Sequence, residues 1–133
     1  MATVKELLAR GISDLAGVTD TPDLDAEVLL ASSLSKNRVW LRTWPDNVVP
    51  ERECERFLEC LSLRAAGRPV AYILGTREFW SLQLKVNEHT LIPRPETELL
   101  VETVLGRVSR DDASVIDLGT GTGAIALALA SER

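Results

Sequence analysis

A glycine-rich segment close to residue 120 holds the residues whose types and spacing are best suited to bind a ligand. Residues Val115–Leu118 have the apolar character of a buried β-strand, and a helix is expected over Ala124–Ala130. Between them lie Gly119, Gly121 and Gly123, and glycine lets the backbone turn tightly and bring its N–H groups close to a ligand. The start of the following helix adds a partial positive charge. The pattern predicts a nucleotide-type binding loop.

The residues around these glycines indicate which ligand the loop would bind. Gly119, Gly121 and Ala124 have the spacing of NAD- and FAD-binding loops, but this match alone is weak, and a purely structural turn can share it. Asp117 directly precedes the glycines, where its carboxylate would repel a dinucleotide pyrophosphate and attract the ammonium group of S-adenosylmethionine. The sequence therefore favours S-adenosylmethionine. The predicted cofactor-binding residues are Asp117, Gly119, Thr120, Gly121, Thr122 and Gly123.

The first half of the sequence has the apolar periodicity of helices joined by short loops. Helices are expected to begin at a capping box formed by Thr3 and Glu6, at Thr21 as an N-cap before proline, at Asn37 as an N-cap, and at Pro50. No strand pattern interrupts them. These segments predict an all-α helical bundle over residues 1–73.

The pattern changes after this bundle. A connector or short helix is expected between Gly67 and Gly75, and alternating apolar and polar residues on either side of Ser81 predict a β-hairpin within a linker over residues 74–90. Residues 90–95 cannot be helical because each proline disfavours the α conformation of its predecessor. A helix is expected from Glu96 to Val108. Residues 91–133 then read as the start of an α/β, Rossmann-like domain that stops after its first βα unit.

Composition and charge narrow the class of protein. Lys and Arg number 15 against 20 Asp and Glu, and both halves are acidic, which argues against direct nucleic-acid binding. No apolar run is long enough to span a membrane and no secretion signal opens the chain, so a cytoplasmic protein is expected.

Several side chains that often carry chemistry are expected to be structural. Two cysteines six residues apart on one helix point to different faces, so they can neither form a disulfide nor bind a metal together. A single histidine in a loop makes a metal site or a histidine-based triad improbable, and we expect no metal. Tryptophans in small bundles are usually core residues. These residues are Cys54 and Cys60, His89, and Trp40, Trp44 and Trp80.

Four segments together resemble the HemK/PrmC family, the N5-glutamine methyltransferases of peptide-chain release factors. They are Gly67–Gly75, Glu78–Leu82, Thr90–Glu98 and Asp117–Ala130. The resemblance implies methyl transfer from S-adenosylmethionine to the side-chain amide of the glutamine in the Gly-Gly-Gln motif of release factors. It also implies that the helical front end binds the release factor.

The same resemblance indicates which parts of the site this sequence holds. The Asn-Pro-Pro-Tyr motif that holds the target amide in this family has no counterpart here, so the catalytic residues and the acidic ribose-binding residue are expected beyond Arg133. Arg94, Glu96 and Thr97 lie on an irregular loop that either covers the cofactor or substrate entrance or is a rigid connector in which Thr97 or Glu96 starts the next helix.

Two other functions stay open at this point. In the first, the chain is a helical module that binds a release factor and does nothing else. In the second, it is a fragment of a nucleotide-dependent oxidoreductase. An adenine-N6 DNA methyltransferase would share the amino-methylation chemistry, but the acidic charge of both halves argues against DNA. Because the glycine loop is one edge of a site, we expect the 133-residue chain to be inactive alone and its segment at Val115 to be loosely ordered or paired with another chain.

Overall fold

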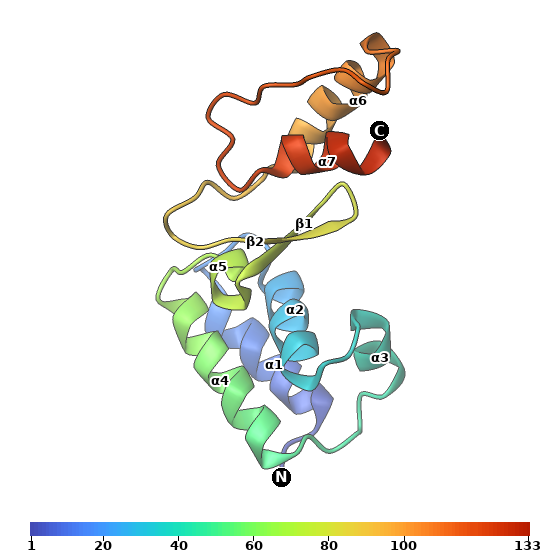
Figure 1. Ribbon diagram of the computed structural model, residues 1–133. Helices are drawn as coiled ribbons and strands as arrows, with labels where there is room; N and C mark the ends of the chain where they lie inside the picture. The colour runs from blue at the N-terminus through green and yellow to red at the C-terminus, as the bar shows by residue number, and fades with distance from the viewer. The chain divides into compact units, whose positions relative to one another are not determined.

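The computed structural model describes residues 1–133, which form two compact units, unit 1 over residues 1–74 and unit 2 over residues 75–133. Each unit has its own hydrophobic core. Unit 1 is entirely helical, whereas unit 2 combines a two-stranded antiparallel sheet with helices (Figure 1). The predictions of a helical front end and of a hairpin are confirmed. None of the helices combines the length and the apolar character that spanning a membrane requires.

The first helix, α1 (Val4–Leu15), begins at the predicted capping box. The backbone N–H of Glu6 donates to the Thr3 hydroxyl at 3.3 Å, and the backbone N–H of Thr3 donates to the Glu6 carboxylate at 2.8 Å. These two bonds satisfy N–H groups that a helix start otherwise leaves unpaired. The cap fixes where α1 starts, and the helix then buries Val4, Leu7 and Leu15 in the core of unit 1.

The second helix, α2 (Pro22–Leu34), begins at the predicted proline with Thr21 as its N-cap, although the Thr21 side chain makes no capping hydrogen bond. Thr21 has a ψ of 59°, outside the extended range that a capping residue normally adopts, and its hydroxyl instead donates to Asp25 Oδ1 at 3.2 Å. The other oxygen of the buried Asp25 accepts a hydrogen bond from Arg64 Nε at 2.8 Å. This ion pair, part-buried on the Arg64 side, joins α2 to α4.

A short helix, α3 (Arg38–Thr43), follows on α2. Asn37 caps it as predicted, because its side-chain oxygen accepts from the backbone N–H of Trp40 at 2.8 Å. The core prediction for Trp44 is wrong: this residue ends α3 and is 55% exposed. The loop after it pairs with the chain start, since the N–H of Val4 donates to Asn47 O at 3.0 Å, and the loop backbone therefore leaves Trp44 on the surface.

Helix α4 (Glu51–Ala65) follows Pro50, and helix α5 (Val70–Leu74) is the short connecting helix. Helices α1, α2 and α4 pack against one another, and α5 contacts α2 and α4 (Figure 1). Phe57 of α4 is fully buried at the centre of this bundle. The remaining members of its core are Val4, Leu7, Leu15, Leu29, Leu30, Ala31, Leu41, Val49 and Leu61.

Unit 2 begins with an antiparallel hairpin of β1 (Thr76–Phe79) and β2 (Leu82–Lys85). The two-residue turn between the strands consists of Trp80 and Ser81, with φ of 51° and 60°. Such turns normally hold Asn or Gly, because a left-handed backbone costs other residues about 1–2 kcal/mol each. The hairpin thus has a strained tip that other contacts must stabilise.

Three helical segments complete unit 2. A 3₁₀ turn, η1 (Pro95–Thr97), leads into α6 (Glu98–Arg107), and α7 (Ala124–Glu132) follows the glycine loop as predicted. Helices α6 and α7 pack together. The core of this unit contains Phe79 and Leu84 from the hairpin, Val101 from α6, and Ala124, Ala128 and Leu129 from α7.

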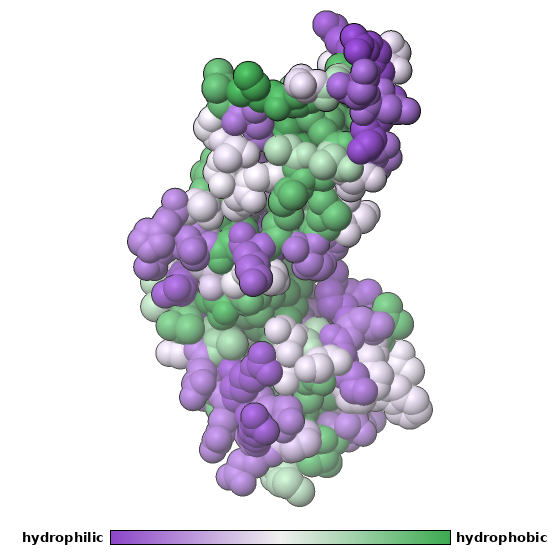
Figure 2. Space-filling view, viewed as in Figure 1, coloured by the Kyte–Doolittle hydropathy of each residue, from purple (hydrophilic) through white to green (hydrophobic).

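The prediction of a buried strand over Val115–Leu118 is wrong. This segment forms no strand, and Ile116 and Leu118 are 85% and 89% exposed. A parallel-type strand is apolar because it expects neighbouring strands and cover on both faces, and the only strand pair in this chain is the hairpin. Figure 2 shows apolar side chains at the surface of this part of unit 2. The segment therefore exposes its apolar residues.

Candidate functional site

The glycine loop has the backbone geometry that its sequence predicts. Gly119, Gly121 and Gly123 all have positive φ, at 70°, 57° and 80°. A Cβ added at Gly119 or Gly121 would meet no atom within 4 Å, so the left-handed backbone, and not crowding, requires glycine there. The open space above both glycines lets a ligand approach the backbone N–H groups.

The third glycine joins the loop to α7. Gly123 is the N-cap of α7, its N–H donates to Thr120 O at 2.9 Å, and its carbonyl accepts from the N–H of Leu127 at 2.8 Å. No side chain caps this nine-residue helix. Unpaired N–H groups at a helix start attract anionic or polar ligand groups.

The carboxylate of Asp117 lies at the entrance to this loop. Asp117 is half-buried, and its Oδ2 accepts a hydrogen bond from the Thr120 hydroxyl at 2.9 Å. This bond holds one carboxylate oxygen against the loop, while Oδ1 is left to accept from a ligand. The loop thus presents a carboxylate beside backbone N–H donors, a set that suits a ligand with both a cationic and a polar end. Thr122, also half-buried, lies between the last two glycines.

The second predicted segment lies on the approach to α6. Arg94 and Glu96 are exposed, and Thr97 is half-buried with its N–H donating to Arg94 O at 3.1 Å. Thr97 occupies the N-cap position of α6, but its side chain makes no capping bond. No hydrogen bond or ion pair joins Arg94, Glu96 or Thr97 to the glycine loop, so whether the segment covers a ligand stays a prediction.

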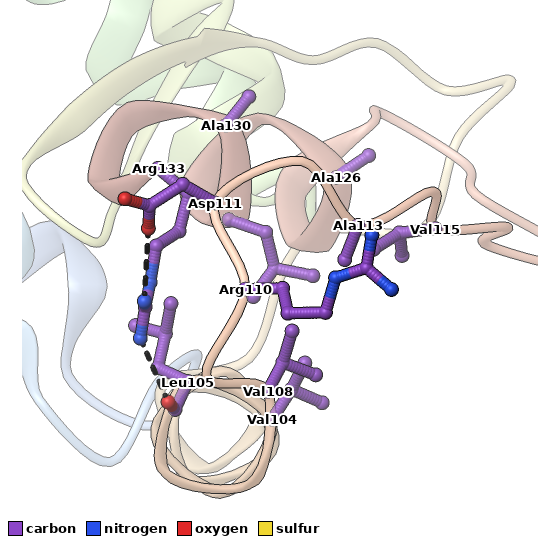
Figure 3. Close-up of a pocket in the computed structure, with 11 residues that line it drawn as sticks. Val104, Leu105, Val108, Arg110, Asp111, Ala113, Val115, Ala126, Ala130 and Arg133 are labelled. Atoms are coloured by element: carbon purple, nitrogen blue, oxygen red, sulfur yellow. Dashed lines mark hydrogen bonds and ion pairs between the residues drawn. The ribbon is translucent and has the colours of Figure 1, made fainter.

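A cavity that was not predicted from the sequence lies in the same unit as the glycine loop. A space of about 330 Å³ lies between α6, α7 and the segment that precedes the glycines (Figure 3). Its walls are mainly apolar, from Val104 and Leu105 on α6 and Ala126 on α7, and no residue of the glycine loop lines it. The signal for it was the apolar composition of α7 on more than one face, which predicts cover by further structure.

Charged residues surround the rim of this cavity. Arg110 donates two hydrogen bonds to Asp112, at 2.8 and 2.9 Å, and these bonds lower the pKa of the Asp112 carboxyl. Arg133 binds Asp111 and the carbonyl of Leu105, which ties the end of α7 to α6 (Figure 3). The rim is thus held by paired charges, and the interior is left to apolar contacts.

The structure thus places a helical unit ahead, in the sequence, of a unit that contains a glycine loop at the start of a helix. The family described as the PrmC N-terminal domain matches residues 6–75. The chain therefore belongs to this family, as its resemblance indicated.

Relatives along the whole sequence carry the name release factor glutamine methyltransferase. The protein of this name from Aliivibrio fischeri is 52% identical over 131 residues, which are 98% of this chain and 46% of that protein. The one from Pseudomonas aeruginosa is 60% identical over 116 residues, 86% of this chain and 42% of the relative. The one from Escherichia coli is 44% identical over 126 residues, 95% and 45% respectively. The chain spans about half the length of the curated relatives it matches.

Proposed function

We propose that the protein carrying this chain transfers a methyl group from S-adenosylmethionine to the side-chain amide nitrogen of the glutamine in the Gly-Gly-Gln motif of peptide-chain release factors. The observation that carries the proposal is the glycine loop, with three left-handed glycines, the Asp117 carboxylate and the uncapped start of α7. The names of the relatives support the same reaction, since all three describe glutamine methylation of release factors. They give no support to an oxidoreductase.

The loop residues fit S-adenosylmethionine. Its ammonium group would be drawn to Asp117, and the backbone at Gly119 and Gly121, where no Cβ intervenes, and at Thr120 would contact the rest of the molecule. Thr122 and Gly123 would complete the cradle at the helix start. When bound, S-adenosylmethionine supplies an electrophilic methyl group. Arg94, Glu96 and Thr97 would then border the entrance to the site.

The reaction explains why a further part of the site is needed. An amide nitrogen is a poor nucleophile, because its lone pair is delocalised into the carbonyl. Methylation forms an N–C bond, breaks the C–S bond of the sulfonium and releases the amide proton, so the amide must be held in line by hydrogen bonds. No residue of this chain is assigned that role. We therefore place the catalytic groups in the part of the protein that the chain does not include.

The organisation of the protein follows from the two units. Residues 1–73 would form the helical domain that binds the release factor, residues 74–90 the connection that contains the hairpin, and residues 91–133 the start of a Rossmann-like methyltransferase domain. The separate core of unit 1 supports a domain that folds by itself. Acidic charge in both halves supports a protein partner rather than a nucleic acid, and a cytoplasmic location suits that partner.

Labelled S-adenosylmethionine and a purified release factor test this function. Both would be added to this chain and, in parallel, to the chain extended to the length of its relatives. We expect methylated glutamine with the extended chain and none with the 133-residue chain. Asp117→Asn in the extended chain should weaken S-adenosylmethionine binding about tenfold, because one charge partner is lost. Asp112→Asn, which changes an exposed carboxylate of the same unit, is the matched control. Absence of transfer by the extended chain would refute the function.

A further inference from the structure

The tip of the hairpin is tied to both segments of the candidate site. The backbone N–H of Trp80 donates to Glu98 Oε1 at 2.8 Å, and its indole N–H donates to Glu132 Oε1 at 2.9 Å. Glu98 is the first residue of α6 and directly follows the segment from Arg94 to Thr97. Glu132 is the last residue of α7, the helix whose start carries the glycine loop. One residue thus contacts the two helices that carry the predicted site.

The hydrogen bonds from Trp80 contribute differently to the stabilisation of the Glu98 and Glu132 carboxylates. A carboxylate at the start of a helix is favoured by the helix dipole, whereas one at the end of a helix is disfavoured. Glu132 is at the unfavourable end of α7, so the indole N–H of Trp80 supplies stabilisation that the helix does not. Two of the three acidic residues at this corner, Glu98 and Glu132, thus accept hydrogen bonds from Trp80, and the third is Glu78.

The backbone of the tip is held in a conformation that needs support. Trp80 and Ser81 both have left-handed φ. Residues other than glycine keep this strained conformation only where surrounding contacts hold it. The Trp80 ring is half-buried and packs against the core of unit 2. Phe79, the residue before it, is 1% exposed in the same core. The tip is therefore anchored on both sides and can act as a fixed point for α6 and α7.

Helix α7 connects the contact with Trp80 at its end to the glycine loop at its start. An α-helix of nine residues is about 13 Å long, and its direction is set where its ends and its buried face are held. Ala124, Ala128 and Leu129 hold the buried face of α7, and Trp80 contacts its last residue. The Trp80–Glu132 bond therefore fixes the end of α7 opposite to Gly123.

We propose that Trp80 is a positioning residue, which sets the placement of the glycine loop relative to the segment from Arg94 to Thr97. This inference rests on the proposed function, in which both segments meet the cofactor. Trp80 itself does not touch the reacting atoms. Its effect is on how well the site is formed before the ligand arrives.

The test measures S-adenosylmethionine affinity in the chain extended to the length of its relatives. Trp80→Phe removes the indole donor and keeps the aromatic ring and the backbone bond to Glu98, and Glu132→Ala removes the acceptor. We expect each change to raise the Kd about tenfold, and the double variant to bind no worse than either, because both remove one bond. Glu132→Gln retains an oxygen acceptor and should restore binding. Trp44→Phe, at an exposed tryptophan of unit 1, is the matched control.

Two outcomes would overturn the positioning role. One is a lower melting temperature in Trp80→Phe with the Kd within twofold of the unchanged protein, which would indicate structural support alone. The other would come from amide hydrogen exchange measured without ligand. The positioning role predicts that Trp80→Phe accelerates exchange both at Gly119–Gly123 and at Arg94–Thr97. Unchanged exchange at either segment would refute the tie. If the unchanged protein binds no S-adenosylmethionine, the proposed function fails, and hydrogen exchange alone decides the role of Trp80.

Discussion

Replacing Gly11 by alanine sets two effects of known size against each other. Gly11 lies inside α1, and a Cβ built there would be 2.9 Å from Ala26 Cβ and 3.1 Å from Phe57 Cζ. Alanine in a helix interior is favoured over glycine by about 1 kcal/mol. Inserting a methyl group into a packed core costs about 1–3 kcal/mol. Because the nearest atom belongs to a short side chain next to the backbone of α2, the core cannot yield cheaply, and overpacking should prevail.

We therefore expect Gly11→Ala to lower the free energy of unfolding by about 1 kcal/mol. For a unit of this size the melting temperature should fall by about 4–8 °C. Urea unfolding followed by far-UV circular dichroism gives the free energy, and amide exchange within α1 assigns it to unit 1.

Two comparisons isolate the contact. In an Ala26→Gly background the 2.9 Å contact is absent, so Gly11→Ala should cost less there, with a coupling energy of about 1 kcal/mol. Gly106→Ala in α6, where an added Cβ meets nothing within 4 Å, should leave stability unchanged or raise it by up to about 1 kcal/mol. A stabilising effect of Gly11→Ala would refute the reasoning, since it would mean that the packing of α1 on α2 and α4 is loose.

Three further changes test other parts of the chain. Arg64→Ala leaves the buried carboxylate of Asp25 without its charge partner and should destabilise unit 1 by about 3 kcal/mol, measured by urea unfolding. Burial raises the pKa of Glu27, but hydrogen bonds from two arginines outweigh this effect and lower the pKa of the folded state below the usual 4.5. The ionised Glu27 therefore stabilises the fold above pH 4.5, and this stabilisation is lost as the pH falls through the folded pKa. Glu27→Gln should thus lower the free energy of unfolding at pH 7 and change it little at pH 3. Gly121→Ala forces a left-handed alanine at φ 57°, a strain of about 1–2 kcal/mol, and isothermal titration of the extended chain should show about tenfold weaker S-adenosylmethionine binding.

Features that depend on neighbours in the sequence could be predicted. The capping box at Thr3, the cap at Asn37 and the hairpin around Ser81 each involve residues close together in the sequence, and the structure has all three. Thr21 shows the limit of such rules. Its hydroxyl donates to Asp25 and accepts no capping bond, and Arg64, 39 residues further along, helps to fix Asp25 in place.

Features that depend on residues distant in the sequence could not be predicted. Val115–Leu118 have the composition of a buried strand, but a strand forms only where another strand or edge pairs with it. At the site, the glycine spacing was sufficient to predict the loop geometry because positive φ is a local property of glycine. The contact of Trp80 with Glu132 spans 52 residues, and no periodicity or motif signals it.

The separation of the two cores has a consequence for how the protein is made. All core contacts of unit 1 lie within residues 1–74, so the 59 residues of unit 2 (75–133) are still to be synthesised once unit 1 is complete. At about 5–20 residues per second this takes about 3–12 s, whereas small helical domains fold in microseconds to milliseconds. Unit 1 is therefore expected to fold on the ribosome long before α7 exists, and damage to its core should reduce yield during synthesis and not only stability afterwards.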